Sequence, residues 1–390
     1  MEIVYLIFIQ LLVSIGILEF LPGMLGILTG IFFLILMGAI LKERNTLFYI
    51  IPIIFFLRVY TGVSDKEITI GKKIDVVTRI FEGKGEILEI DGKYTRLKEY
   101  IIVSKIKDGK YNIKGEVYNI NEGYKNFGKQ YYIDIIENTE IEPNIFEKNM
   151  KLLVESRSQS KSYGEKNLYK ALILGEKENL FKETKKLFLD TGLMHLLAIS
   201  GLHMGIIVYI LEKVFKGVSI SKRWKNILIL ILISLYFFSI RITPSVQRAY
   251  IMVFIYLSGN IIYENPSIKK SFSIAFIISL LINPLIYKEP SFIMSYWAVF
   301  CIILFQPIMR NFKGGLNSYL VFTSYIQLAM LPLSYLIFGK ISLISMVSSI
   351  ILTPLGVIYI FLAFIGLILP ISPVSTLVYN ILIKGMEFFS

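Results

Sequence analysis

The densest group of chemically capable side chains lies in the otherwise apolar stretch 191–205. His195, Ser200 and His203 place two imidazoles and a hydroxyl there, next to Gly201. Polar groups inside an apolar span need a polar partner or a water-filled cavity, and they commonly mark function. On a straight helix Ser200 and His203 share a face, and the glycine allows close helix packing or a local break. The alternative is that both histidines bond to nearby carbonyls and the glycine only packs.

Ser200 and His203 also have the residue types of a nucleophile and its base. Such a pair must meet while a third group orients the base, and no Asp or Glu lies in the predicted spans near them. An intramembrane serine hydrolase is therefore the least favoured alternative. We expect that the chain is not an enzyme.

Arg248 is the second candidate, because it lies inside an apolar span that begins near Pro244. A guanidinium several residues into a span costs roughly 2.5 to 3.5 kcal/mol on insertion scales, so something must compensate for it. Phosphate is a suitable partner, since arginine presents a bidentate fork to it. The alternative is a structural bond to a carbonyl, or a side chain that reaches the interface near Arg241.

The sequence contains few of the cysteine and histidine residues that metal or redox chemistry would need. Its one cysteine, Cys301, allows no intrachain disulfide, and two histidines cannot by themselves complete a zinc site. We therefore expect no metal and no cofactor.

The elements that must position these residues are membrane helices. Hydrophobic residues make up 55% of the 390 residues and charged residues only 18%, against about 45–50% and about 25% in soluble domains. Apolar runs long enough to cross a bilayer, roughly 17–25 residues, occur within 1–61 and then repeatedly from 193 onward. We expect a polytopic α-helical membrane protein with N-terminal transmembrane helices in 1–61 and a transmembrane core in 192–390. The shorter run 341–353, just before Pro354, is a candidate re-entrant segment.

Residues 62–142 have a different pattern, of short β-branched and aromatic stretches separated by glycine turns. Five expected strands fit a small closed barrel of the OB type, and an SH3-like barrel or a small sandwich fits the pattern nearly as well. Residues 143–191 are helical in pattern but too charged to cross a membrane. They are expected to form amphipathic interfacial helices, with their lysines among lipid headgroups or along a polar vestibule.

Lys and Arg in the short loops set the orientation. Lys42 and Arg44 mark a cytoplasmic loop, and the basic loops after the span 193–212 fall on the same predicted side. The β domain is therefore expected outside the cytoplasm.

The 191–205 segment, with what precedes and follows it, resembles the ComEC family of bacterial DNA-internalisation channels. Four separate motifs carry the resemblance, in the expected order: Lys170-Ala-Leu-Ile-Leu-Gly175-Glu176 with Phe188 to His203, Pro244-Ser-Val-Gln-Arg248-Ala249, Gln327-Leu-Ala-Met-Leu-Pro332, and Phe338-Gly339-Lys340-Ile-Ser342. The order of parts, which is membrane helices, an external β domain and a polytopic core, is also similar, so the resemblance covers essentially the whole chain.

Three features depart from the family pattern. The segment 291–296 lacks a glutamine that family members often have, and Ser349 stands where an asparagine often precedes the proline. The chain also ends at Ser390 without the metallo-β-lactamase-like domain of many relatives. No nuclease activity is therefore expected from it.

The resemblance implies a channel in the bacterial cytoplasmic membrane that imports single-stranded DNA during natural transformation. A transporter of a small or lipidic anion on the same fold is the alternative. Partners would be single-stranded DNA, the lipid bilayer, and a separate nuclease, DNA receptor and cytoplasmic motor or single-strand-binding proteins. The residues expected along the DNA path are His195, Ser200, Gly201, His203, Pro244, Arg248 and Gln327.

The resemblance also suggests that the β domain handles single-stranded DNA. OB-type binding combines a basic groove with aromatic stacking platforms, yet residues 62–142 carry 14 basic and 15 acidic side chains, a net charge of −1. A local basic face is possible, and its candidate DNA contacts are Lys93, Arg96, Lys98, Lys105 and Lys107. Core packing is the commoner role of the aromatic residues in this domain.

Overall fold

The computed structural model describes most of the chain from residue 130 onward and parts of what precedes it. The described residues are 7–13, 15, 50–55, 71, 73–81, 84–90, 93–94, 100–102, 109–121, 130–177, 180–240, 242–262, 267–283, 286–309, 312, 314–338 and 343–390. The chain forms two compact units, Met1–Pro143 with Phe276–Lys288, and Asn144–Ala275 with Glu289–Ser390. Of the expected N-terminal transmembrane helices in 1–61, only 7–13, 15 and 50–55 are described, all as helix; the rest lies outside the described residues.

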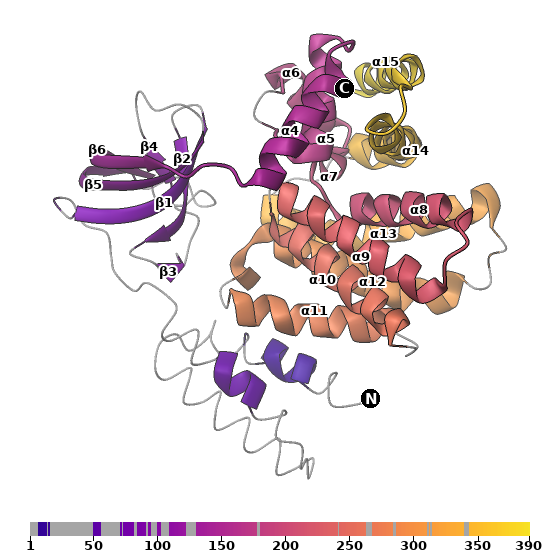
Figure 1. Cartoon of the computed structure of the whole chain (residues 1–390), viewed down its shortest axis with the longest axis horizontal. Helices are drawn as coiled ribbons and strands as arrows, with labels where there is room; N and C mark the ends of the chain where they lie inside the picture. The colour runs from indigo at the N-terminus through magenta and orange to yellow at the C-terminus, as the bar shows by residue number, and fades with distance from the viewer. Residues whose placement is uncertain are drawn as a thin grey trace. The chain divides into compact units, whose positions relative to one another are not determined.

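The first unit contains a closed ring of strands (Figure 1). The strands are β1 (Lys73–Phe81), β2 (Lys84–Ile90), β3 (Lys93–Tyr94), β4 (Tyr100–Ile102), β5 (Gly109–Asn121) and β6 (Gln130–Glu140). Neighbouring strands follow the order β1-β5-β6-β4-β2, and β2 pairs with β1 again, which closes the ring. The β4–β6 pair is parallel and the other pairs are antiparallel. Each of the five expected strands has a described counterpart, and the third, expected over 94–103, is described as β3 and β4, with 95–99 outside the described residues.

Alternation along each strand builds the interior of the barrel. Val76 on β1, Ile113 on β5 and Ile133 on β6 are buried, because every second side chain of a strand points to the same face. Gly115 lies where β5 and β6 approach closely. A Cβ at that position would overlap the Ile133 side chain and come within 2.7 Å of the Asp134 carbonyl oxygen, so only glycine fits there.

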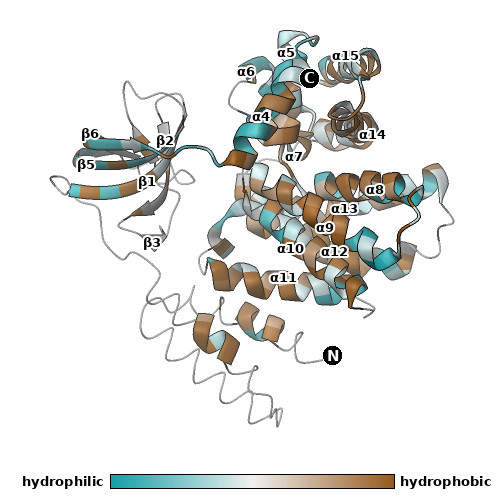
Figure 2. Ribbon diagram, viewed as in Figure 1, coloured by the Kyte–Doolittle hydropathy of each residue, from teal (hydrophilic) through white to brown (hydrophobic). Residues whose placement is uncertain are grey.

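The second unit is helical. Its first helices are α4 (Ile145–Ser158), α5 (Tyr163–Leu174), α6 (Lys182–Asp190), α7 (Met194–Leu197), α8 (Gly201–Lys216), α9 (Lys222–Ser239) and α10 (Pro244–Ile261). The later ones are α12 (Pro290–Met309), α13 (Gly315–Phe338), α14 (Leu343–Gly366) and α15 (Ser372–Phe389). The helix α11 (Ile268–Ile282) belongs partly to each unit, and the short 3-10 helix η1 (Ile286–Lys288) belongs to the first. Hydrophobic residues dominate α11, α12 and α14, whereas α4 and α6 carry hydrophilic residues beside hydrophobic ones (Figure 2).

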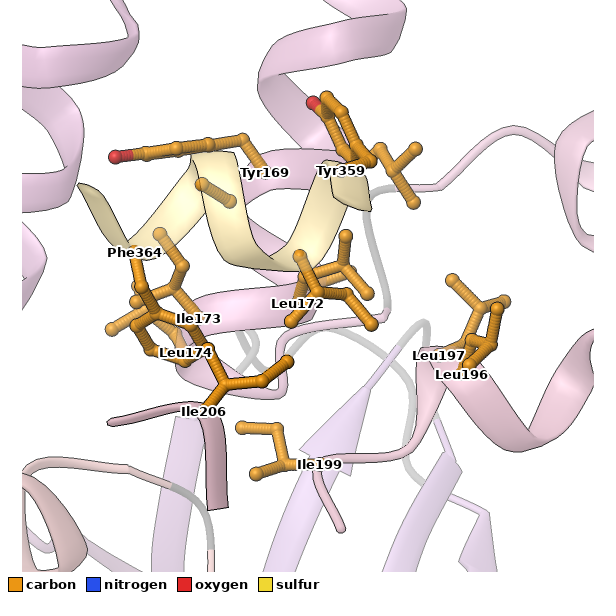
Figure 3. Packing of buried hydrophobic residues seen from close by; sticks show 14 of the residues in the cluster. Tyr169, Leu172, Ile173, Leu174, Leu196, Leu197, Ile199, Ile206, Tyr359 and Phe364 are labelled. Carbon is orange, nitrogen blue, oxygen red and sulfur yellow. The ribbon is translucent and has the colours of Figure 1, made fainter. Parts of the chain in front are cut away.

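Helix α5 lies in the core of this unit, which corrects part of the expectation for 143–191. α4 and α6 keep exposed faces, as interfacial amphipathic helices would, but α5 buries nearly its whole length, from Glu165 to Leu174. Figure 3 shows Tyr169 and Leu172 of α5 among hydrophobic side chains that include Tyr359 and Phe364 of α14. The prediction missed this burial because it was based on the charge content of 143–191, and α5 begins with charged residues.

Polar contacts fix α5 on two sides. Towards α4, Lys166 and Lys170 both bond the Glu155 carboxylate, and these two bonds hold the pKa of Glu155 below its usual value. Towards α15, the buried Lys161 and Glu165 pair with each other at 2.6 Å. A further set of bonds ties this pair to α15: Lys161 Nζ donates to Ser375 Oγ at 2.6 Å, and Thr376 Oγ1 donates to Glu165 at 2.8 Å.

Three of the described helices are long and apolar enough to cross a membrane: Pro290–Ile308, Gly315–Ile337 and Ile344–Gly366. These helices are those of a helical membrane protein. The prediction that 341–353 is a separate re-entrant segment is wrong, because Leu343–Gly366 is one continuous helix with Pro354 inside it.

A side chain from a neighbouring helix compensates for Pro354, a proline inside one of these spans. A proline has no N–H and leaves the carbonyl four residues earlier without its helical partner. For Pro354 that carbonyl belongs to Ile350, and the Tyr319 hydroxyl of α13 donates to it at 2.6 Å. Helix α14 can therefore keep Pro354 at membrane depth. A second bond between neighbouring spans runs from Trp297 Nε1 of α12 to the carbonyl of Ala329 of α13, at 2.8 Å.

Candidate functional site

The segment 191–205 does not form the straight helix on which the sequence argument relied. The helix α7 ends at Leu197, Ala198 is extended, and α8 begins at Gly201. Ser200 is therefore the N-cap of α8, with an extended backbone, and His203 is the third residue of the helix. Serine favours this position because its hydroxyl satisfies first-turn N–H groups.

Ser200 and His203 form a reciprocal capping box. The Ser200 hydroxyl accepts from the Leu202 N–H at 3.3 Å, and the Ser200 N–H donates to His203 Nδ1 at 3.3 Å. Since Nδ1 accepts that bond, the neutral ring carries its hydrogen on Nε2. The Nε2 atom is buried and has no hydrogen-bond partner in the part of the chain that the structure describes.

His203 lies in the core, with 0% of its surface exposed and its ring edge-on to Phe364 at 6.3 Å between centroids. Its Nδ1 lies 3.4 Å from Ser200 Oγ, the distance of a loose pair. Within the described residues no carboxylate contacts Nε2, so nothing orients the imidazole as a base would require. The geometry gives His203 a capping role, and its place on a DNA path stays a prediction.

The turn before α7 is packed tightly on α14. Gly192 has φ +70°, and a Cβ there would come within 2.7 Å of the Ser345 carbonyl oxygen. Both the backbone conformation and this close contact therefore require glycine. The Ser348 hydroxyl donates to the carbonyl of Thr191 at 3.1 Å. His195 is exposed, and its Nδ1 contacts the carbonyl oxygen of Gly192 at 3.0 Å.

The structure brings Gly201 and Arg248 together. A Cβ placed on Gly201 would lie 3.4 Å from Arg248 Nη2 and 3.9 Å from Ala249 Cβ. The first turn of α8 is therefore in contact with α10 at the guanidinium. Pro244 stands at the start of α10, where its missing N–H costs nothing, and Thr243 caps the helix by accepting from the Val246 N–H at 3.4 Å.

Arg248 is only 6% exposed and is held by α12 and by its own helix. Its Nε donates to Ser295 Oγ at 2.7 Å, its Nη1 lies 3.3 Å from Met252 Sδ, and its guanidinium lies 5.7 Å from the centroid of the Tyr296 ring. No carboxylate in the described residues lies within ion-pair distance of it. Its positive charge is therefore buried without a negative partner from that part of the chain.

Gln327 makes a separate contact. Its Nε2 donates to Ser349 Oγ at 2.6 Å and so connects α13 to α14. Within the described residues no hydrogen bond joins Gln327 to the group around Arg248.

The candidate DNA contacts of the β domain are largely untested by the structure. Lys93 lies in β3, and the other four candidates, Arg96, Lys98, Lys105 and Lys107, lie outside the described residues. Among the described residues no group of three or more His, Cys, Asp or Glu side chains could hold a metal ion.

Sequence reasoning missed two sets of residues. Ser295 and Tyr296 were noted only as part of the segment 291–296, which lacks the family's glutamine, although they are what holds Arg248. The second set is the buried pair Lys161 and Glu165: Lys161 was among the lysines expected near lipid headgroups or along a polar vestibule, and Glu165 was not singled out. The i,i+4 spacing of the pair and its position before an apolar run were the available signals, but the same signals describe an exposed helix face.

Comparisons with known proteins agree with this arrangement of motifs. A family model described as Competence protein matches residues 172–389. Among curated proteins, the chain is 29% identical over 187 residues to ComE operon protein 3 of Bacillus subtilis (strain 168), which covers 48% of this chain and 24% of that protein. It is 26% identical over 227 residues to an uncharacterized protein of Aquifex aeolicus (strain VF5), covering 56% of this chain and 53% of the relative.

The chain thus matches between a quarter and about half of the length of these curated relatives. No solved structure matches.

Proposed function

Because the chain belongs to the Competence protein family, we propose that it acts in DNA uptake as a membrane channel that passes a single DNA strand across the bacterial cytoplasmic membrane. Besides family membership, one observation supports the proposal. The guanidinium of Arg248 is buried and has no carboxylate partner in the described residues. A buried charge needs a compensating one. The phosphates of a passing strand would supply it.

Arginine suits this role better than lysine. Its planar fork bonds two phosphate oxygens at once, and the guanidinium is more weakly hydrated than an ammonium ion. In Arg248 the Nε atom is used for Ser295, while Nη2 faces Gly201 and makes no hydrogen bond to the described part of the chain. The side chain is therefore fixed at one edge and free at another, as a positioned phosphate contact requires.

We further propose that the β domain is an OB-like barrel outside the cytoplasm. Five main strands in a closed ring with a single parallel pair support the OB assignment, and the basic loops of the sequence support the orientation. Lys93 and the lysines and arginine that follow it are the proposed DNA contacts of this domain. The surrounding partners would be a nuclease, a DNA receptor and a cytoplasmic motor or single-strand-binding proteins.

A transporter of a small or lipidic anion is the second candidate, because the same buried Arg248 would also compensate a smaller anion. Hydrolysis by Ser200 is less well supported, since His203 is used as a helix cap and Nε2 has no orienting partner in the described residues. We propose that the protein itself makes and breaks no bonds.

Uptake of labelled transforming DNA by a deletion strain tests the proposal. Expression of this chain is expected to restore the entry of acid-insoluble label into the cytoplasm. If membrane insertion is normal and labelled DNA still does not enter, while uptake of a labelled small anion is restored, the anion transporter replaces the channel.

The orientation has its own test. Lys110 is exposed on β5, so Lys110→Cys in a Cys301→Ser background should react with an impermeant maleimide added to intact cells whose cell envelope admits the reagent to the cytoplasmic membrane. Reaction only after lysis would place the barrel in the cytoplasm.

A further inference from the structure

The contact between α8 and Arg248 has an unusual electrostatic character. The N-terminus of an α-helix carries a partial positive charge of about half an elementary charge. The 16-residue α8 presents this end to the cationic side chain of Arg248, since a Cβ on Gly201, its first residue, would lie 3.4 Å from Nη2. Two positive groups are thus held together at a largely buried position, with no carboxylate beside them in the described residues.

The capping box leaves one donor of this turn unused. The N–H groups of Ser200 and Leu202 are bonded within the box, and the hydroxyl of Ser200 also receives the N–H of His203. The Met204 N–H donates to the Ser200 carbonyl. Gly201 N–H has no partner in the part of the chain that is described, and it lies on the residue that faces Arg248 Nη2.

We infer that Arg248 and the first turn of α8 form a subsite for one phosphodiester oxyanion, which Gly201 keeps open by lacking a side chain. Nη2 of Arg248 and the N–H of Gly201 would donate to the anion, while Ser295 and Tyr296 hold the guanidinium in place. The inference rests on the proposed function, and it adds a second element, α8, and a specific size limit to the site. Both a DNA strand and a phospholipid headgroup contain this chemistry, so the test separates them.

The first arm of the test measures binding of a single-stranded thymidine oligonucleotide to the purified full chain in detergent. A methylphosphonate oligonucleotide, which has neutral linkages, is the comparison probe. Each phosphate contact contributes about −0.7 to the slope of log K against log salt for single strands. The variants are Arg248→Gln and Gly201→Ala, with Lys216→Gln as the matched control, because Lys216 is an exposed cation at the other end of α8.

Wild-type protein is expected to prefer the phosphodiester strand. Arg248→Gln should weaken its binding by about tenfold or more, the effect of losing a hydrogen bond to a charged group, and should make the slope shallower by about 0.7. Gly201→Ala keeps every charge and fits the helix, yet it should reduce affinity in the same direction because its methyl group occupies the subsite. Lys216→Gln should change affinity by less than twofold.

The second arm counts phosphatidylglycerol molecules retained by each variant in native mass spectrometry. Loss of one lipid from Arg248→Gln and Gly201→Ala, with unchanged oligonucleotide binding, would keep the subsite, assign it to a headgroup, and contradict a DNA path at Arg248. If both variants behave like Lys216→Gln in both arms, the inference is overturned. It is also overturned, without any variant, if wild-type protein binds the methylphosphonate and phosphodiester strands equally.

Discussion

The Nε atom of Arg248 donates a hydrogen bond to Ser295 Oγ at 2.7 Å, across the interface between α10 and α12. A second pair is closely similar, since Gln327 Nε2 of α13 donates to Ser349 Oγ of α14 at 2.6 Å. Ser349 stands where the sequence departs from the family pattern, whereas Ser295 lies in the segment 291–296, which departs from it by lacking a glutamine. In each case a serine hydroxyl is the partner of an expected path residue, so the short hydroxyl side chains belong to the site.

Loss of the Ser295 hydroxyl should therefore impair Arg248 without removing its charge. Ser295→Ala is expected to reduce DNA import at matched membrane abundance, because the guanidinium loses the bond that fixes its orientation, a contact typically worth about 1.5–3 kcal/mol. Ser219→Ala, at an exposed position, is the control. Import by Ser295→Ala equal to that of the control would mean that the bond does not position Arg248.

The bond from Tyr319 to the Ile350 carbonyl should stabilise α14 only because Pro354 is present. Tyr319→Phe is expected to lower stability by about 1–2 kcal/mol, since it leaves that carbonyl without a partner. In a Pro354→Ala background the helix supplies its own N–H, so the same change should cost less. Thermal unfolding of the four proteins in detergent measures the coupling, and equal costs in both backgrounds would contradict this explanation.

The buried pair Lys161 and Glu165 should behave as a unit. Lys161→Met leaves a buried carboxylate without its cation and is expected to cost about 3–5 kcal/mol, whereas Lys161→Met with Glu165→Leu should cost much less. Denaturant unfolding checks both. Lys114→Met breaks the exposed pair Lys114–Glu137 and should change stability only slightly. A double variant no more stable than the single one would show that the bonds to α15, rather than the pair, dominate.

The general organisation of the chain could be predicted from sequence because each part has a distinct period. Alternation of apolar residues with glycine turns predicted the strands of the barrel, and long apolar runs predicted the helices from α8 onward. The helix α14 was divided at Pro354, since the compensating hydroxyl of Tyr319 comes from another helix and leaves no local signal.

The site was predictable in its residues but not in its geometry. Polar side chains in an apolar run identified Ser200, His203 and Arg248, yet the break before Gly201 depends on the packing of the 191–197 turn on α14. The contact between Gly201 and Arg248 joins positions 47 apart in the chain, and no local pattern encodes it. The burial of α5 was missed for the same reason, because its polar partners, a carboxylate on α4 and hydroxyls on α15, lie elsewhere in the chain.

DNA import by Arg248 variants tests the central claim most directly. Arg248→Lys keeps the charge but loses the planar fork, and Arg248→Gln keeps hydrogen-bonding capacity without charge. With membrane abundance matched by immunoblot, we expect import of labelled DNA to fall from wild type to Arg248→Lys and again to Arg248→Gln, with Lys216→Gln close to wild type. Wild-type import by Arg248→Gln would contradict the account, because Arg248 would then be a structural anchor and the strand would cross the membrane elsewhere.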